Sequence, residues 1–394
     1  MNDLLISLMV IPLVAAAAPL LASAIGKVAK VPLVVFEIVL GIMIGPSLLG
    51  WAEPTEFIKV LADLGLAMLF FMAGNEINFS SIKGRSLNRA SLAWLISLVG
   101  GLVVGILLAP TVAAGVFIGI ALSSTALGTL LPMLRDAKEL TTPFGKAVTA
   151  IGTVGEFGPL LAISLFLSGR SLGPSAFVLA GFVLLSGLAI WLAGRGENKI
   201  IHRMVNRTLH SSGQFAVRLV LLTVALLVGL SIAFGLDMLL GAFAAGILWR
   251  VLISGASPHD REVVEHKLDA VAFGFLVPVF FINTGITFDL AALLADPLIL
   301  ALVPLFLLLF LVVRGLPNLL AAPVGAPPRD KRAIVLFAAT GLPIIVAVTA
   351  IGQEHGLLSS GIATALIGAG MLSVLLFPML ALIHRRRGVE VAPR

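Results

Sequence analysis

The chain of 394 residues contains no cysteine, and only 12% of its residues are charged. The absence of cysteine excludes a disulfide scaffold and any redox or metal site that depends on thiols. A soluble domain carries about 25% charged residues, so the scarcity of charge excludes a water-soluble globular protein and a disordered chain. Apolar residues are abundant instead, at 59% of the chain, and the mean hydropathy is +1.12. The sequence therefore predicts a polytopic membrane protein.

The long apolar runs predict the membrane spans. A helix needs about 20 apolar residues to cross the hydrocarbon core, and the runs are continuously apolar rather than alternating, which favours helices over a β-barrel. We therefore expect an all-α protein with about thirteen transmembrane helices. They lie at about 4–24, 32–50, 57–75, 91–110, 112–134, 147–169, 173–194, 215–233, 236–253, 270–286, 298–316, 333–352 and 358–383.

The basic residues predict the orientation of these spans. With the N-terminus placed outside, 23 of the 26 Lys and Arg residues fall in segments on the cytoplasmic side, and the exceptions are Lys59, Arg170 and Arg314. Cytoplasmic loops of membrane proteins carry such an excess of positive charge. We expect an integral protein of a bacterial-type inner membrane, with the C-terminus in the cytoplasm. The net charge of +6 is then a topology signal, and no nucleic-acid partner is expected.

Two similar strings indicate an internal repeat. Residues 69–79 (LFFMAGNEINF) end the third predicted span, and residues 279–289 (VFFINTGITFD) end the tenth. These two spans run in opposite directions, as the halves of an inverted-topology repeat do. We expect a single transmembrane domain over 1–394, with repeat 1 at about 1–169, a linking helix at 173–194 and repeat 2 at about 215–383.

In that arrangement the fifth span corresponds to the twelfth, and both carry small, hydroxyl-bearing or helix-breaking residues. The fifth contains Ser124 and Thr125, and the twelfth contains Thr340, Gly341 and Pro343. These residues favour two discontinuous helices, whose freed backbone groups can bind an ion near the middle of the membrane. Close packing of small residues between helices is the alternative interpretation.

Glu156 is the only charged residue in the run 147–169. An ionisable group at that depth costs about 2.5–3.5 kcal/mol on insertion scales, so it should face the bundle interior or a water-filled cavity. A carboxylate there can hold either a proton or a metal ion, which is the coupling that an antiporter needs. A structurally paired glutamate is the alternative. Arg314, within 298–326, is either a charge partner of Glu156 or an arginine that extends to the membrane surface.

Two further acids are candidates for the same cavity. Glu37 lies in the second span and Asp237 near the outer end of the ninth, and structural pairing would explain either equally well. Glu76, at the inner end of the third span, is expected at the membrane interface. Every histidine lies in a loop or at a span end, so no catalytic or metal cluster can form at depth. We expect a transporter rather than an enzyme, with no cofactor, because neither a GxGxxG nor a Walker motif is present.

Three strings resemble one transporter family. Residues 32–46 (PLVVFEIVLGIMIGP), 64–79 (LGLAMLFFMAGNEINF) and 121–136 (ALSSTALGTLLPMLRD) are similar to those of the monovalent cation:proton antiporters, and most similar to the Kef-type and related Na⁺/H⁺ branch. The resemblance implies two inverted six-helix repeats with crossed discontinuous helices, an elevator-like movement and a homodimer. Kef-type relatives often add a cytoplasmic nucleotide-binding domain, but the last span ends close to Arg394, so none is expected here.

The resemblance also implies a site. The family's ion-binding carboxylate follows an Asp or Asn on the sixth helix, and that pair reads Gly155-Glu156 here. It implies that Glu156 binds the transported cation or a proton, with Ser124, Thr125 and Thr153 completing the site. The family's basic residue on the eleventh helix corresponds to Arg314. Because Gly155 contributes no charge, we expect electroneutral 1:1 exchange.

The expected function is therefore secondary antiport of Na⁺ or K⁺ against H⁺ across the lipid bilayer. Two alternatives use the same scaffold. A cation channel or K⁺ efflux route would show flux that is independent of a proton gradient. A carrier of organic ions is favoured by Arg314 but disfavoured by the lone glutamate at mid-depth.

Overall fold

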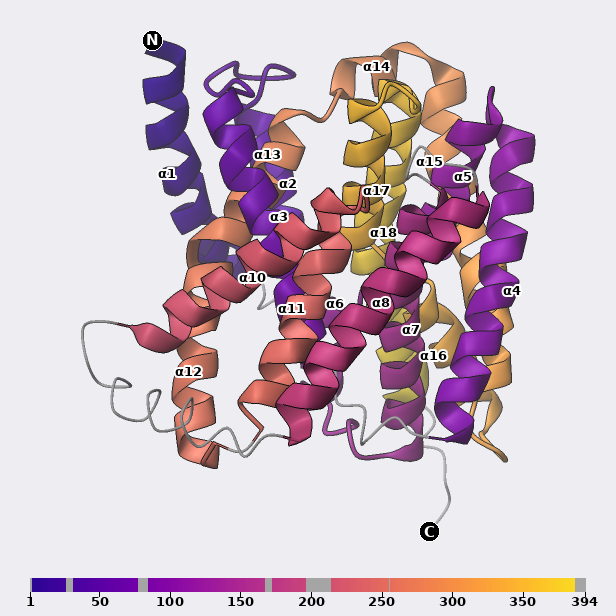
Figure 1. Ribbon diagram of the computed structural model, residues 1–394. Helices are drawn as coiled ribbons and strands as arrows, with labels where there is room; N and C mark the ends of the chain where they lie inside the picture. Colours follow the sequence, from indigo (N-terminus) through magenta and orange to yellow (C-terminus); the bar gives the residue numbers. More distant parts are fainter. Residues whose placement is uncertain are drawn as a thin grey trace.

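The computed structural model describes residues 2–25, 31–76, 84–166, 172–195, 214–254 and 256–386, and all regular structure within them is helical (Figure 1). In chain order the elements are α1 (Asn2–Ile25), α2 (Leu33–Ile44), α3 (Glu56–Glu76), α4 (Arg85–Leu108), α5 (Val112–Leu122), α6 (Leu127–Asp136), α7 (Pro143–Phe166), α8 (Leu172–Arg195), α10 (Phe215–Ala233), α11 (Met238–Leu252), α12 (Pro258–Val271), η1 (Ala272–Leu276), α13 (Val277–Ile286), α14 (Leu290–Ala295), α15 (Pro297–Leu309), η2 (Phe310–Gly315), η3 (Leu316–Ala321), α16 (Pro328–Ala338), α17 (Pro343–Glu354) and α18 (Ser360–Arg386).

Eleven helical segments in the described part of the chain are long and apolar enough to cross a membrane. Two shorter apolar helices, α2 and α11, coincide with the second and ninth predicted spans. The all-α membrane class is therefore confirmed. The count of thirteen stays a prediction, because α2 has 12 residues and α11 has 15, while a perpendicular crossing takes about 20.

Two of the spanning segments are interrupted, in agreement with the predicted discontinuous helices. One break separates α5 from α6, at residues 123–126, and the other separates α16 from α17, at residues 339–342. Pro343 is the first residue of α17. The N–H of a first helical residue has no partner within the helix, so a proline there costs no hydrogen bond. The two breaks touch, because the Ala126 N–H donates to the Thr340 carbonyl at 2.8 Å.

The helices form two sets, named here after one member of each. In the α3 set, α1, α2, α3, α10, α11, α12 and α13 pack mainly on one another. In the α7 set, α4 to α7 pack with α15 to α18. The helix α8 touches both, through α11 and α7, and it corresponds to the predicted linking helix. The repeat boundaries themselves stay a prediction.

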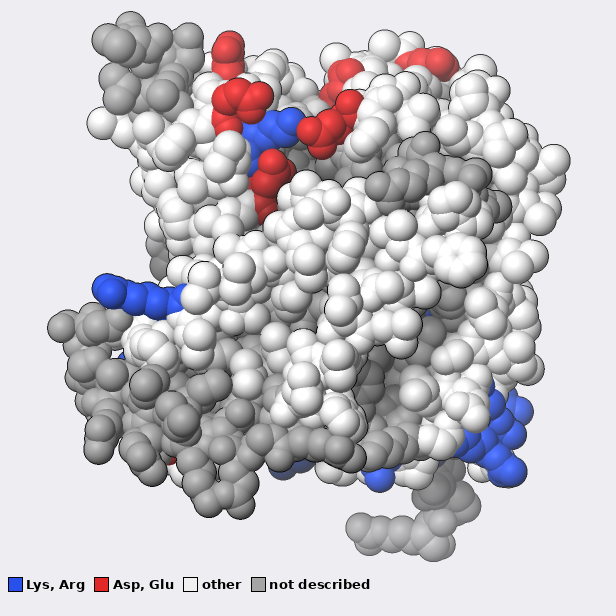
Figure 2. Space-filling view, in the orientation of Figure 1, with Lys and Arg blue, Asp and Glu red and all other residues white. Residues whose placement is uncertain are grey.

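Figure 1 places the start of α1 at the upper face of the bundle and the end of α18 at the lower face. In Figure 2 the acidic side chains gather at the upper face, and most Lys and Arg side chains lie towards the lower one. This separation agrees with the uneven distribution of Lys and Arg that the loops predict. The orientation in a cell membrane stays a prediction.

Glycine contacts hold the α3 set together. Where α2 crosses α13, a methyl group on Gly285 would collide with the Ile38 carbonyl, and one on Gly41 would collide with the Ile282 carbonyl. The helix pair α3 and α11 meets in the same way at Gly74 and Gly246. Helices in lipid gain much of their association from such close backbone approach.

Gly285→Val should therefore lower the apparent melting temperature of the detergent-solubilised protein by roughly 1–4 °C, since overpacking costs about 1–3 kcal/mol. Gly229→Val is the matched control, because a Cβ on Gly229 in α10 would meet nothing within 4 Å. Thermal unfolding followed by intrinsic fluorescence measures both. Equal effects of the two variants would contradict the close crossing of α2 and α13.

Candidate functional site

Glu156 lies on α7 and is 5% exposed. Its side chain lines a cavity of about 510 Å³, which we call the Glu156 chamber. Walls of this chamber come from both helix sets: Glu37 on α2 and Glu76 on α3 face Thr129 on α6 and Pro343 on α17. Within the described residues the Glu156 carboxylate has no ion pair and no hydrogen bond. Among the described residues it is therefore a buried acid that faces a cavity and has no structural partner.

The backbone beside Glu156 is shaped by Pro159. A proline has no N–H, so Pro159 leaves the Gly155 carbonyl without its usual helical partner. The Thr125 N–H from the first break donates to that carbonyl at 2.9 Å. The Thr125 hydroxyl in turn donates to the Ala338 carbonyl at 2.6 Å. One threonine therefore ties α7 to both discontinuous helices.

Arg314 completes this junction. Its side chain is fully buried and starts from the wide π-type turn η2. Nε donates to the Thr125 hydroxyl at 2.8 Å, and Nη2 donates to the Ile151 carbonyl at 3.0 Å. The ion pair with Glu156 that was one expectation for Arg314 is absent from the described residues. The guanidinium instead supports the break between α5 and α6.

Gly155 is what allows this approach. A Cβ there would collide with Arg314 Nη2 and would lie 2.7 Å from both Cβ and Oγ1 of Thr125. The position therefore has no room for the acidic or amide side chain that the resemblance leads one to expect. The place of that side chain is taken by the guanidinium and by the Thr125 hydroxyl.

The predicted hydroxyl ligands do not gather around Glu156. Ser124 is 2% exposed and donates to the Ala121 carbonyl at 2.8 Å, while the hydroxyl of Thr125 is fully engaged as described above. Thr153 donates to the Thr149 carbonyl at 2.9 Å and lines a different cavity. The hydroxyl that does line the Glu156 chamber belongs to Thr129. Its position one helical turn beyond Thr125 is the signal that could have identified it.

The second break is also held by hydrogen bonds. Thr340 donates through its hydroxyl to the Leu336 carbonyl at 3.0 Å, and the Gly341 N–H donates to Ser373 Oγ at 3.1 Å. Of the residues from which this break was expected, only Pro343 lines the Glu156 chamber.

The two further candidate acids, Glu37 and Asp237, have different roles. Glu37 is 4% exposed and lines the Glu156 chamber, as expected of a cavity acid. Asp237 does not line it: its Oδ1 accepts from the Leu239 N–H at 2.8 Å and so caps the start of α11. Asp237 was considered as a second acid of this cavity, and the structure shows it instead as the N-cap of α11. Glu76, expected at the membrane interface, lines the chamber.

A second cavity, of about 620 Å³, is lined partly by α12, which lies at the lower face in Figure 1. We call it the lower vestibule. Its charged lining residues are Glu76, Arg135, Arg250, Glu262, Glu265, His266 and Asp269. Met72 and Glu76 line both the chamber and the vestibule. The two cavities therefore adjoin at these two residues.

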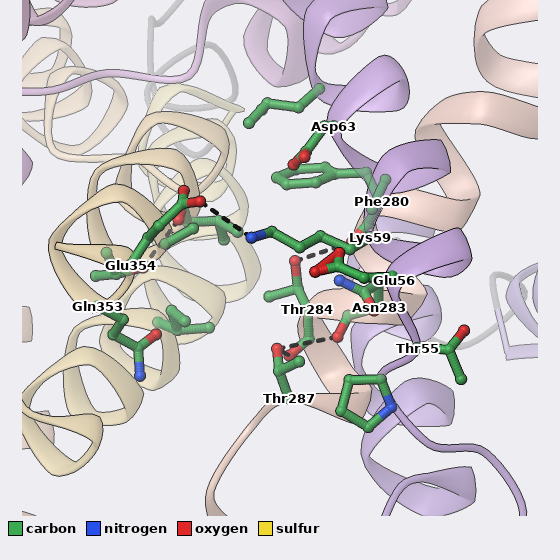
Figure 3. A pocket seen from close by; sticks show the side chains of 17 residues that line it. Thr55, Glu56, Lys59, Asp63, Phe280, Asn283, Thr284, Thr287, Gln353 and Glu354 are labelled. Atoms are coloured by element: carbon green, nitrogen blue, oxygen red, sulfur yellow. Dashed lines mark hydrogen bonds and ion pairs between the residues drawn. The ribbon is translucent and has the colours of Figure 1, made fainter. Parts of the chain in front are cut away.

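A third cavity, of about 400 Å³, is lined by the start of α3 and the ends of α13 and α17 (Figure 3). These helix ends lie towards the upper face in Figure 1, and we call the cavity the upper cavity. It shares no lining residue with the Glu156 chamber. Across it, Lys59 on α3 pairs with Glu354 on α17, with 3.0 Å between Nζ and Oε1. This ion pair joins the α3 set to the α7 set on the side opposite the vestibule.

Comparison with known proteins gives consistent matches. The profile of a family described as sodium/hydrogen exchanger, transmembrane, matches residues 13–382. YjbQ of Bacillus subtilis (strain 168), named as a candidate Na⁺/H⁺ antiporter, is 27% identical over 372 residues, which are 89% of this chain and 58% of YjbQ. GerN of Bacillus cereus, named as a Na⁺/H⁺-K⁺ antiporter, is 28% identical over 279 residues, 66% of each chain. The chain thus spans less than two thirds of either relative.

A solved structure matches along nearly the whole chain. The sodium proton antiporter MjNhaP1 from Methanocaldococcus jannaschii, at pH 8, superposes with a TM-score of 0.69, covering 98% of this chain and 97% of that one. The identity is 18%, so this likeness concerns the fold. It confirms the predicted Na⁺/H⁺ antiporter-like fold.

The junction at Gly155 can be tested by a double-mutant cycle. Gly155→Ala and Thr125→Val should each destabilise the protein by about 1–3 kcal/mol, because each disturbs the bond between Arg314 and Thr125. The double variant should lose less than the sum of the two. Chemical unfolding in detergent measures all three, with Gly181→Ala in α8 as the control that meets open space. If the two losses in unfolding free energy simply added up, Gly155 and Thr125 would not be acting through the same hydrogen bond.

Proposed function

The chain belongs to the sodium/hydrogen exchanger family, and on that premise we propose that it is a secondary antiporter exchanging Na⁺ or K⁺ for H⁺. The observation that carries the proposal is Glu156, a buried carboxylate without a polar partner among the described residues, facing a cavity between two helix sets. The name of GerN includes K⁺ beside Na⁺, which is why both cations are retained. The chamber's lining residues contain three carboxylates and neither Lys nor Arg, which disfavours an organic anion as substrate.

Competition at Glu156 would couple the two ions. The carboxylate can bind a proton or a cation, but not both, and the side chain with its bound ion is electrically neutral in either case. A neutral group crosses a low-dielectric region at far lower cost than a bare charge. The unloaded carrier therefore stays where it is, and exchange proceeds 1:1 without net charge movement. Gly155 adds no second charge to this count.

The seam between the helix sets supports elevator-type alternating access. Both the Glu156 chamber and the upper cavity lie in that seam, and only the chamber contains Glu156. In the proposed cycle the α7 set moves along the α3 set and carries Glu156 from the vestibule to the upper cavity. In this scheme the ion pair of Lys59 with Glu354, which joins the two helix sets at the upper side, has to break when the α7 set moves.

The assembly and orientation follow from the same scheme. A stationary α3 set requires an anchor, which we propose is the α3 set of a second copy in a homodimer. The excess of Lys and Arg towards the lower face (Figure 2) supports an orientation in the cell membrane with the N-terminus outside and the C-terminus in the cytoplasm. The opposite directions of α3 and α13 support the inverted repeats over about 1–169 and 215–383.

Glu156→Gln should abolish cation-driven proton movement in sealed proteoliposomes, down to the level of protein-free vesicles, because glutamine cannot release a proton. The assay is a pH-sensitive dye inside the vesicles, with Na⁺ or K⁺ added outside. Asp237→Asn is the matched control. Asparagine can still cap α11, and position 237 does not line the chamber. Flux that survives in Glu156→Gln would move the site elsewhere, and cation leak without proton movement in both proteins would favour a channel.

Competition also predicts a pH dependence. On the acid side of the profile, the cation concentration for half-maximal rate should rise about tenfold for each unit by which the pH falls, because protons and cations compete for one carboxylate. The maximum rate at saturating cation should stay unchanged. Initial rates over a matrix of pH and cation concentration measure this. A maximum rate that falls with the half-saturating concentration constant would indicate separate proton and cation sites.

A further inference from the structure

Asn75, near the end of α3, is a buried amide without a matched partner. It is 3% exposed, and its Oδ1 has no hydrogen-bond partner in the part of the chain that the structure describes. Leaving such an acceptor unsatisfied costs about 1–3 kcal/mol, so the position calls for a ligand. Asn75 lines the lower vestibule, which is where that ligand would come from.

The next residue, Glu76, supplies the charge. Its side chain is exposed and lines both the lower vestibule and the Glu156 chamber. A carboxylate beside a neutral amide oxygen is a set of hard oxygen donors, the kind that Na⁺ and K⁺ favour over nitrogen or sulfur. The two residues therefore offer oxygen ligands to the vestibule, and Glu76 also reaches the Glu156 chamber.

The surrounding charges favour a cation there. Four carboxylates line the vestibule, at Glu76, Glu262, Glu265 and Asp269, against two guanidiniums. Arg250 and Glu265 neutralise each other, because Arg250 Nη1 lies 3.1 Å from Glu265 Oε1. Three carboxylates then remain against the guanidinium of Arg135, with His266 Nε2 3.8 Å from Glu262 Oε1. A vestibule with an excess of acids raises the local concentration of cations.

We propose that Asn75 Oδ1 and the Glu76 carboxylate form a second binding site for Na⁺ or K⁺, separate from Glu156. The inference rests on the proposed function in one respect: the site holds the cation before it passes to Glu156. Glu76 belongs to the α3 set and Glu156 to the α7 set, so the ion is transferred from one helix set to the other within the chamber.

The first test measures binding without transport. The full chain carrying Glu156→Gln is unfolded thermally in detergent with Na⁺, K⁺ or N-methyl-D-glucamine at equal ionic strength and pH. We expect Na⁺ or K⁺ to raise the melting temperature of this variant relative to N-methyl-D-glucamine. Adding Glu76→Gln or Asn75→Leu should remove that shift. Adding Glu262→Gln, which removes the same charge elsewhere in the vestibule, should leave it.

Two outcomes overturn the inference, and a third separates it from the proposed function. A shift in the wild type that vanishes in Glu156→Gln would mean a single site, and it would leave the proposed antiport intact. A shift removed equally by Glu262→Gln would mean a general effect of vestibule charge. If proton flux in the wild type proved independent of Na⁺ and K⁺, the proposed function would fail, while a cation-specific shift in Glu156→Gln would still report the second site.

Kinetics provide a readout that a structural defect would not imitate. In proteoliposomes, Glu76→Gln with Glu156 intact should raise the half-saturating cation concentration about tenfold, as expected for the loss of one charged ligand, with little change in the maximum rate. Asn75→Asp, which adds a charge at nearly constant size, should lower the half-saturating concentration. A fall in the maximum rate alone, with the half-saturating concentration unchanged, would contradict a binding role.

Discussion

Inside the hydrocarbon layer every freed backbone polar group needs a partner from the protein, and this requirement shapes the centre of the molecule. Two helices are interrupted at the same depth, and each break satisfies the other: the Ala126 N–H donates to the Thr340 carbonyl. Pro159 frees one further carbonyl, which Thr125 occupies. The buried Arg314 then binds the same threonine. Remove any of these groups and the low dielectric penalises its orphaned partner.

The position of the candidate ion site follows from that junction. Glu156 is adjacent to Gly155, whose carbonyl and missing side chain hold Thr125 and Arg314 in place. The junction therefore fixes the backbone of α7 at the very residue before the carboxylate, while the carboxylate itself faces the open chamber. A site of this kind combines a rigid backbone support with a carboxylate that remains free to bind an ion. The hydrogen bonds of the support do not involve that carboxylate.

The sequence was sufficient for the features that depend on depth along a helix. Apolar runs, the lone Glu156 and the small residues at both breaks predict the all-α class, the buried acid and the discontinuous helices. Features that depend on rotation about a helix were missed, since depth does not say which neighbour a side chain faces. Pairing with Glu156 was one of two expectations for Arg314, whose side chain instead binds Thr125. The cap at Asp237 was readable, because an acid directly before an apolar run is a helix-start signal.

The ion pair at the upper face has a consequence for how the molecule responds to its surroundings. Lys59 and Glu354 are 48% and 60% exposed in their side chains, and pairs in that setting contribute about 0–1 kcal/mol and weaken as salt screens them. Under the proposed alternating access, such a weak ion pair keeps the conformations open to the lower and upper sides close in free energy. The salt concentration of the fluid bathing that face would then shift the populations of the two conformations.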